Sequence, residues 1–181
     1  MLVKILVGLT VLIGLLLGYV ALQPKNFAVS REIKIAASPE KVFPHLNDVK
    51  KANAWNPFLK ADQGAKITYF GPAAGVGAGN SWDGDSQVGK GSATIVESIP
   101  GSAVRLRLDY EKPFKGTNTV TYALKSEGKE TTVSWSIAGE SAFVPRLFCT
   151  LFFMNMDKMI GNSFEKGLAD LKAIVETETK K

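Results

Sequence analysis

A period-two alternation of apolar and polar residues occupies the middle of this chain and constrains its fold more than any other feature. The alternation begins near Ala65 and continues to about Gly139, and between Val104 and Tyr110 every second residue is apolar while charged residues fill the intervening positions. Such strands bury one face and expose the other, and short turns between them make neighbours antiparallel. We predict strands at residues 66–70, 80–84, 89–99, 103–112, 117–125 and 131–138, after an earlier strand at 29–37.

The apolar face of this sheet needs a cover, and the C-terminal segment is the part of the chain left to supply it. Apolar residues recur there at helical spacing from Met156 to Val175, which predicts a long helix lying across the sheet. Short helices are expected after Ser38-Pro39 and near residues 49–54. The fold class is therefore α+β, with one domain of moderate size.

The N-terminus carries a separate signal. Residues 5–22 contain no charge, and at ~1.5 Å per residue these eighteen positions reach ~27 Å as a helix, close to the ~30 Å hydrocarbon core of a membrane. A secretory signal peptide is the competing interpretation, but its apolar region usually spans only ~7–15 residues. Cleavage after Ala21 would also place the bulky Tyr19 where a small residue is expected.

We therefore predict a retained anchor at 1–22, a linker at 23–27, a ligand-binding domain at 28–178 and a tail at 179–181. Lys4 on one side of the anchor is balanced by Lys25 and Arg31 on the other, so the positive-inside rule gives almost no orientation. Because a short N-terminus followed by an exported domain is the commoner arrangement, we expect a single pass through the cell inner membrane with the domain on the non-cytoplasmic side.

Charge and cysteine content exclude some functions and leave others open. The net charge is +5, with basic residues spread along the chain instead of gathered in blocks, which argues against nucleic acid as a partner and is compatible with a surface facing anionic lipid. The single cysteine, Cys149, lies in an apolar stretch and is expected to be buried. One cysteine cannot form an internal disulfide, so the redox compartment stays undecided.

The sequence offers little for catalysis, and we expect no cofactor, no metal and no catalytic residue. His45 is the one histidine and is expected to be solvated or to cap a helix, while Asp83 and Asp85 flank a glycine in the manner of turn residues. The glycine-dense stretch 71–79 lacks the spacing of a nucleotide-binding loop, and a strand follows it. We interpret it as a hairpin loop that could gate a cavity.

Six motifs in a fixed order resemble one known superfamily. They are IAASPEKVF at 35–43, WNPF at 55–58, FGPAAGVGAGNSW at 70–82, EKPF at 111–114, TVSW at 132–135 and DKMIGNSFEKGL at 157–168. Together they are similar to the START / Bet v 1-like (SRPBCC) superfamily and, within it, to the bacterial polyketide cyclase/dehydrase and lipid-transport group. The resemblance covers nearly everything after Val29. It implies a helix-grip fold, in which a curved antiparallel sheet wraps a long C-terminal helix around a cavity for a hydrophobic ligand.

Fold alone does not choose an activity. The first hypothesis is a membrane-anchored binding or transfer protein for a lipid or another hydrophobic small molecule. The alternatives are a cyclase or dehydratase that uses the same cavity, and a protein-interaction module with a filled core. The apolar stretch 143–154 has two interpretations: it makes a second contact with the membrane, or it is buried as a lid helix. The candidate ligand-binding residues are Trp82, Leu108, Tyr110, Tyr122, Trp135, Met156, Ile160 and Phe164.

Overall fold

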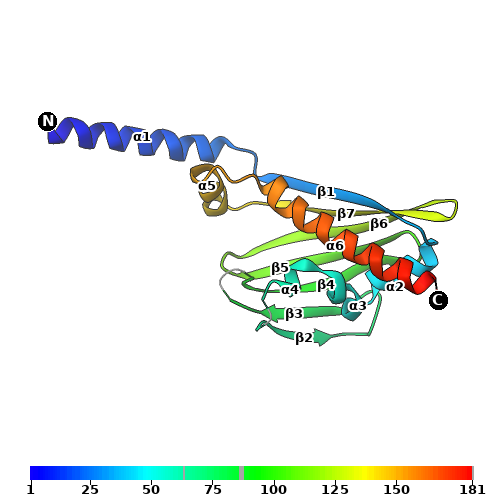
Figure 1. Cartoon of the computed structure of the whole chain (residues 1–181). Coiled ribbons are helices and arrows are strands. Elements are labelled where there is room, and N and C mark those ends of the chain that lie inside the picture. Colours follow the sequence, from blue (N-terminus) through cyan, green and yellow to red (C-terminus); the bar gives the residue numbers. More distant parts are fainter. Residues whose placement is uncertain (63, 86–87, 181) are drawn as a thin grey trace.

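The computed structural model describes residues 1–62, 64–85 and 88–180, which form a seven-stranded antiparallel sheet with helices on one face (Figure 1). The order across the sheet is β1-β7-β6-β5-β4-β3-β2, so the first strand pairs with the last and the others follow as a meander. The strands are β1 (Asn26–Ile35), β2 (Lys66–Phe70), β3 (Gly79–Asp83), β4 (Lys90–Ile99), β5 (Ala103–Lys112), β6 (Gly116–Glu127) and β7 (Glu130–Glu140).

The long helix α6 (Met156–Thr179) lies over the β1 and β7 side of the sheet, as the C-terminal periodicity predicts. The short helices α2 (Pro39–Asn47), α3 (Val49–Trp55) and α4 (Pro57–Lys60) pack beside it on the same face, called the inner face below (Figure 1). The helix-grip architecture is therefore confirmed. Helix α6 buries Phe164, Leu168, Leu171 and Val175, whereas Met159 is exposed although the predicted stripe included it.

An ionic contact fixes α6 on β1. The Arg31 guanidinium donates through Nε to Glu165 at 2.8 Å and through Nη2 to Asp157 at 3.0 Å. Gly161 makes this contact possible, because a Cβ atom there would overlap the guanidinium of Arg31. The hydrogen bonds from Arg31 lower the pKa of the Asp157 carboxyl.

The Arg31 contact predicts an acid-dependent stability. A carboxyl whose pKa is lowered by folding stabilises the protein above its unfolded pKa and loses that contribution as the pH falls through its folded pKa. We expect the free energy of unfolding to decrease as the pH falls below about 4, the usual pKa of aspartate, and to decrease less steeply in Arg31→Gln. Urea unfolding across the acid range measures both slopes. Arg107→Gln, which removes the exposed pair with Asp109, is the control and should keep the wild-type slope; equal slopes for the wild type and Arg31→Gln would contradict the prediction.

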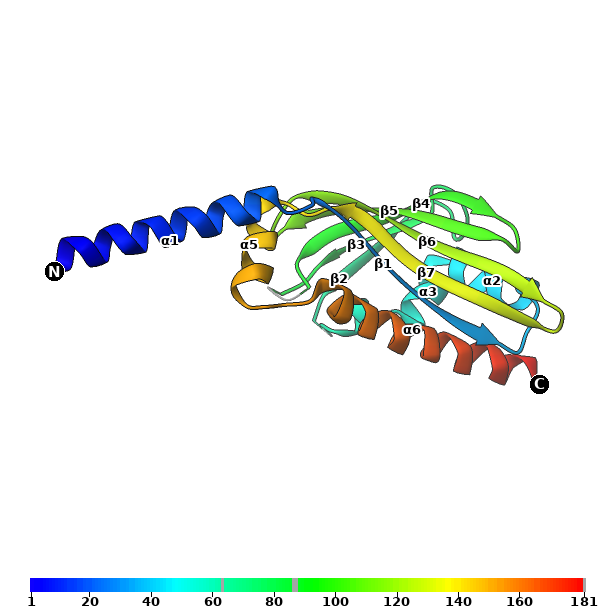
Figure 2. The same ribbon diagram turned by 90° about the horizontal axis from the view of Figure 1, so that it is seen from above.

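Two helices lie apart from the body of the domain. Helix α1 (Leu2–Leu22) is long and apolar enough to cross a membrane, a property that signal sequences share, and Val20 is its one buried residue. Helix α5 (Phe143–Leu151) packs beside the last turns of α1 and runs crosswise to it, between the end of α1 and the start of α6 (Figure 2).

Several local expectations need correction. The linker is shorter than residues 23–27, because Asn26 and Phe27 already pair with Glu140 and Gly139. His45 is buried instead of solvated, and its Nε2 atom lies 3.1 Å from a carboxylate oxygen of Glu178 in α6. These differences arise from chain segments far apart in sequence, which a local pattern does not reveal.

The glycine-dense loop is attached to its surroundings by backbone hydrogen bonds. Gly75 N–H donates to the Asn47 carbonyl, and Gly77 N–H donates to the Ile95 carbonyl. Both glycines have positive φ angles, which side chains with a Cβ atom rarely adopt. The glycines therefore serve the turn geometry between β2 and β3.

Candidate ligand-binding site

All eight predicted ligand-binding residues belong to the inner face or to the helix that covers it. Trp82 comes from β3, Leu108 and Tyr110 from β5, Tyr122 from β6 and Trp135 from β7, while α6 supplies the other three. Trp82, Tyr122, Trp135 and Phe164 are buried, and Leu108, Tyr110, Met156 and Ile160 are half-buried. The structure divides most of them into two aromatic groups.

The first group, the Trp135 cluster, is packed solid. Trp135 stacks on Phe164 with ring centroids 4.0 Å apart and planes 12° apart, so a sheet residue and a helix residue expected to face each other across a cavity touch instead. Trp55 meets Trp135 edge-on at 5.3 Å, and Tyr122 lies 5.5 Å from the same ring. Phe58 completes the cluster at 6.1 Å from Trp135.

Trp55 and Phe58 were absent from the predicted site. The signal that could have found them is the WNPF motif at 55–58, where Pro57 starts α4 and turns the second ring onto the cluster. Trp55 donates its indole N–H to the His45 carbonyl at 3.1 Å, so its polar group is satisfied. The indole Nε1 of Trp135 is buried and finds no hydrogen-bond partner among the described residues.

The second group, the Trp82 cluster, lies farther across the sheet, on strands remote from the one that α6 chiefly contacts. Trp82 and Tyr110 meet edge-on with centroids 5.9 Å apart, above a floor of small residues. A Cβ atom on Gly91 would overlap the Trp82 ring, and one on Gly139 would overlap the Asn118 side chain. These glycines therefore let the large side chains lie flat on the sheet.

The polar side chains of the two clusters are neutral, whereas Arg31 of β1, which also lies on the inner face, is charged and pairs with Asp157 and Glu165 of α6. Burial raises the pKa of Tyr110, and a hydrogen bond with Asn118 opposes part of that rise. Burial alone raises the pKa of Tyr122 far above its usual range. Asn80 precedes Trp82 by two residues on β3 and therefore faces the same side of the sheet. Its side chain is buried, and its amide nitrogen has no hydrogen-bond partner among the described residues. Both tyrosines stay protonated at neutral pH, and the surface suits an uncharged ligand that carries a hydrogen-bond acceptor.

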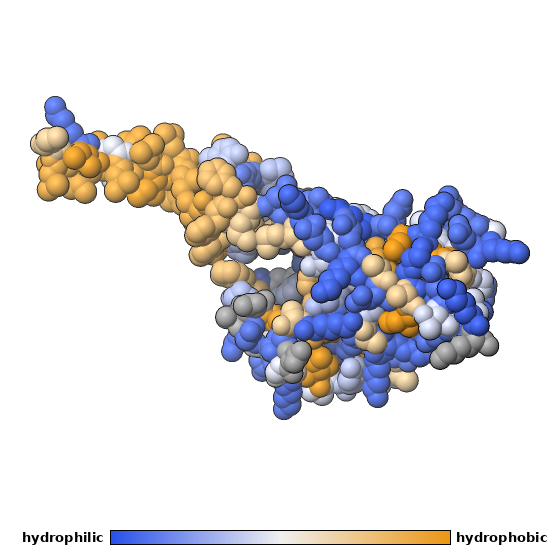
Figure 3. Space-filling view, viewed as in Figure 1, coloured by the Kyte–Doolittle hydropathy of each residue, from blue (hydrophilic) through white to orange (hydrophobic). Residues whose placement is uncertain are grey.

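Two cavities lie where the helices α1 and α5 meet the domain, and Figure 3 shows the surface hollowed between apolar α5 and the body of the molecule. The smaller, of about 430 Å³, is called the α6-side pocket; its wall includes Phe27, Cys149 and Met156. Of the eight predicted residues, Met156 is the one that lines either cavity. The α6-side pocket adjoins the inner face, because Phe27 pairs with Gly139 and Gly139 pairs with Asn118 of the Trp82 cluster.

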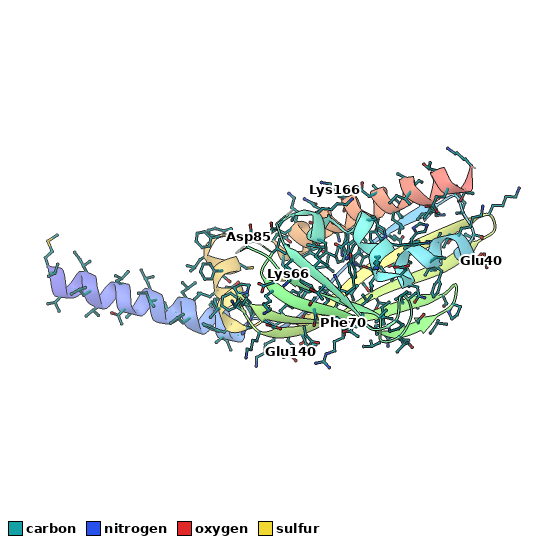
Figure 4. The ribbon with its side chains drawn as sticks, turned by 90° about the horizontal axis from the view of Figure 1, so that it is seen from below. Glu40, Lys66, Phe70, Asp85, Glu140 and Lys166 are labelled. Carbon is teal, nitrogen blue, oxygen red and sulfur yellow. The ribbon has the colours of Figure 1, made fainter. Side chains whose placement is uncertain are left out.

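The described part of the chain contains no group of three or more His, Cys, Asp or Glu side chains placed to hold a metal. The strand residues of the aromatic clusters lie on β3, β5, β6 and β7. Among the described residues, the inward-facing strand positions beside these rings hold no carboxylate and no histidine. Asp83 pairs with Lys90 at 3.6 Å, and the Asp85 carboxylate accepts from the Val88 N–H in a turn. The Asp85 side chain and Lys66 of β2 lie along the β2 and β3 side of the domain (Figure 4).

Solved structures with this fold come from several organisms. Protein CV1439 from Chromobacterium violaceum is 19% identical with a TM-score of 0.56, and the match covers 85% of this chain and 99% of that one. Mll3558 from Rhizobium loti is 16% identical with a TM-score of 0.59, covering 82% and 96% of the two chains. The ginseng major latex-like protein 151 from Panax ginseng is 12% identical with a TM-score of 0.57, covering 83% and 97%.

These similarities establish the fold alone, since all three identities are low. No curated protein matches the chain. The family model described as "Polyketide cyclase / dehydrase and lipid transport" matches residues 26–176, from the first residue of β1 to the last turns of α6. The aromatic inner face, the covering helix and this match over most of the chain agree, and the chain belongs to the polyketide cyclase/dehydrase and lipid-transport family.

Proposed function

We propose that this protein is a membrane-anchored binding or transfer protein for a lipid or another hydrophobic small molecule, held on the inner face beside the Trp82 cluster. The observation that carries the proposal is the buried Asn80 side chain, whose Nδ2 atom has no hydrogen-bond partner among the described residues and which shares a face of the sheet with the Trp82 and Tyr110 rings. An unpartnered buried donor costs roughly 1–3 kcal/mol, and a bound acceptor would recover that cost.

The position of α5 supports delivery from a membrane. Seven apolar residues from Phe143 to Met154 expose more than a third of their surface, and Phe153 is 96% exposed with a positive φ of 51°. Figure 3 shows this apolar surface continuing that of α1. With α1 in the bilayer, α5 would lie along the membrane surface, and the α6-side pocket next to it would open toward the lipid.

A cyclase or dehydratase is the second candidate, and the Tyr110–Asn118 pair is the observation that favours it. A buried, protonated tyrosine can donate to a carbonyl oxygen and polarise it. Turnover by such a mechanism would also need a base, and the described inner-face strand positions that carry the clusters hold no carboxylate or histidine. Binding without turnover is therefore the function that the geometry supports best; a protein-interaction module would instead need an inner face closed to small molecules.

The test is to purify the full chain in a mild detergent, record native mass spectra and extract bound molecules with solvent. We expect a co-purifying hydrophobic molecule, or binding of an environment-sensitive hydrophobic dye with its emission shifted to the blue. Asn80→Leu, which removes the unpartnered donor and keeps an apolar side chain of similar size, should weaken retention of an acceptor-bearing ligand severalfold. A protein that emerges empty and ignores the dye would contradict the proposal and favour the protein-interaction alternative.

A further inference from the structure

A buried arginine at the junction of α1 and α5 lacks an anionic partner. Arg146 of α5 is 8% exposed, and its Nη1 atom donates to the Gln23 carbonyl, just after α1, at 2.6 Å. Among the described residues, its buried Nε atom has no hydrogen-bond partner and no carboxylate pairs with the guanidinium. Burying a cation without an opposite charge is costly, so an anion from outside the chain would be stabilised here.

The surroundings of Arg146 add to the positive charge. The larger cavity, of about 880 Å³ and called the junction pocket, is lined by Arg146 together with Lys25 and Lys115. Neither lysine forms an ion pair with any described residue, and Glu140 is the one acidic side chain on the wall (Figure 4). Three basic groups against one acidic group leave an excess of two positive charges around an open pocket.

The junction pocket lies on the opposite face of the sheet from the proposed ligand site. On the sheet, its wall is formed by Thr117 and Thr119 of β6 and by Ala138 of β7. The adjacent residues Asn118 and Ile137 point to the inner face instead. Because successive strand residues point to opposite faces, a molecule in the junction pocket does not occupy the inner face, although Lys25, Ser141 and Arg146 line the α6-side pocket as well.

The pocket also lies at a defined depth. Ala21 in the last turn of α1 and Phe143 in the first turn of α5 both contribute to its wall. A helix of 21 residues is ~32 Å long at ~1.5 Å per residue, about the thickness of the hydrocarbon core. If α1 spans the bilayer, its C-terminal end, and with it the junction pocket, lies at the level of the lipid phosphates.

We infer that the junction pocket binds the phosphate of a membrane lipid headgroup, with Arg146, Lys25 and Lys115 as its donors. This inference rests on the membrane placement in the proposed function, and it adds a headgroup site separate from the inner face. Arginine suits the role because its planar guanidinium presents several N–H donors to phosphate oxygens. A phosphate bound here would hold α1, the start of β1 and α5 together at the membrane surface.

The experiment uses the full chain, stripped of lipid in a nonionic detergent and titrated with dioleoyl phosphatidylglycerol in native mass spectrometry. Dioleoylglycerol, which has the same chains without the phosphate, should bind at least about tenfold more weakly, since each basic group near an anionic headgroup contributes measurably. Inorganic phosphate tests a soluble source of the same group. Displacement of the lipid by phosphate at equal concentration would overturn the lipid assignment.

Lys25→Gln combined with Lys115→Gln should weaken phosphatidylglycerol binding about tenfold or more. The matched control is Lys125→Gln with Lys129→Gln, which removes the same charge around the β6–β7 turn and should leave binding unchanged. Arg146→Lys keeps the charge but not the fork of donors, and should bind more weakly than the wild type. Unchanged lipid binding in the Lys25/Lys115 variant would overturn the inference.

Hydrophobic dye binding to the inner face separates this result from the proposed function. The Lys25/Lys115 variant should bind the dye as the wild type does. Loss of lipid binding with dye binding intact supports two separate sites, whereas a wild type that binds phosphatidylglycerol but no dye would contradict the proposed function and leave the headgroup site standing.

Discussion

Trp135→Ala is expected to lower the free energy of unfolding by about 3–5 kcal/mol, the usual cost of truncating a fully buried aromatic side chain. Trp135 is 2% exposed and contacts Phe164, Trp55, Tyr122 and Phe58, so its removal would leave a cavity that links α6, α3 and the sheet. Urea unfolding monitored by circular dichroism measures the change. A loss below about 1 kcal/mol would mean that the cluster is not the packed core described here.

Two further variants refine this prediction. Phe153→Ala removes an aromatic ring that is 96% exposed, and stability should change by no more than about 0.5 kcal/mol. Trp135→Phe keeps a stacking ring and removes the unpartnered N–H, so it should cost less than half as much as alanine. If that N–H serves a ligand, Trp135→Phe should also weaken hydrophobic ligand binding more than its small effect on stability would explain.

Phe152→Glu with Phe153→Glu is expected to abolish most of the membrane affinity that α5 contributes. In the full chain these two rings are 64% and 96% exposed and follow the last residue of α5. The comparison uses residues 24–181, which lack α1, so that α5 is the membrane contact under test. Burying each ring in lipid would contribute at least ~1.5 kcal/mol, so losing both should reduce partitioning into phosphatidylcholine vesicles about a hundredfold or more. Vesicle flotation at increasing lipid concentration measures the partition coefficient.

The control for the α5 variant carries the same two charges elsewhere. Val76→Glu with Ile99→Glu replaces two exposed apolar residues in the β2–β3 loop and at the end of β4, and it should partition as the parent does. Circular dichroism confirms that all three proteins are folded. Equal loss in both variants, or no loss in the α5 variant, would show that α5 is not a membrane contact.

The geometry links these predictions into one arrangement. Helix α5 packs against the C-terminal end of α1. Arg146 of α5 connects the two helices by donating a hydrogen bond to the carbonyl of Gln23, the residue after α1. The α6-side pocket lies next to this junction, and its wall includes Phe27 of β1, which is in phase with the inner face. Glu40, by contrast, marks the end of the domain away from α1 (Figure 4).

The architecture follows from patterns that are visible in the sequence. The alternation in β5, β6 and β7 specified which residues face inward, because side chains along a strand point to opposite faces in turn. The short turns between these strands made consecutive strands antiparallel neighbours. The stripe in α6 specified its buried face for the same kind of reason. The N-terminal helix could be recognised from the length of its apolar segment and from the absence of charge within residues 5–22.

Tertiary structure alone decided how the site residues are used. The alternation placed Trp135 and Trp82 on one face, but it could not show that Trp135 stacks on Phe164 while Trp82 lies over Gly91. Those contacts depend on the curvature of the sheet and on where α6 crosses it. The lack of an anionic partner for Arg146 among the described residues was equally hidden, because its surroundings combine α1, the β5–β6 turn and α5, which are distant in sequence and meet only in the folded chain.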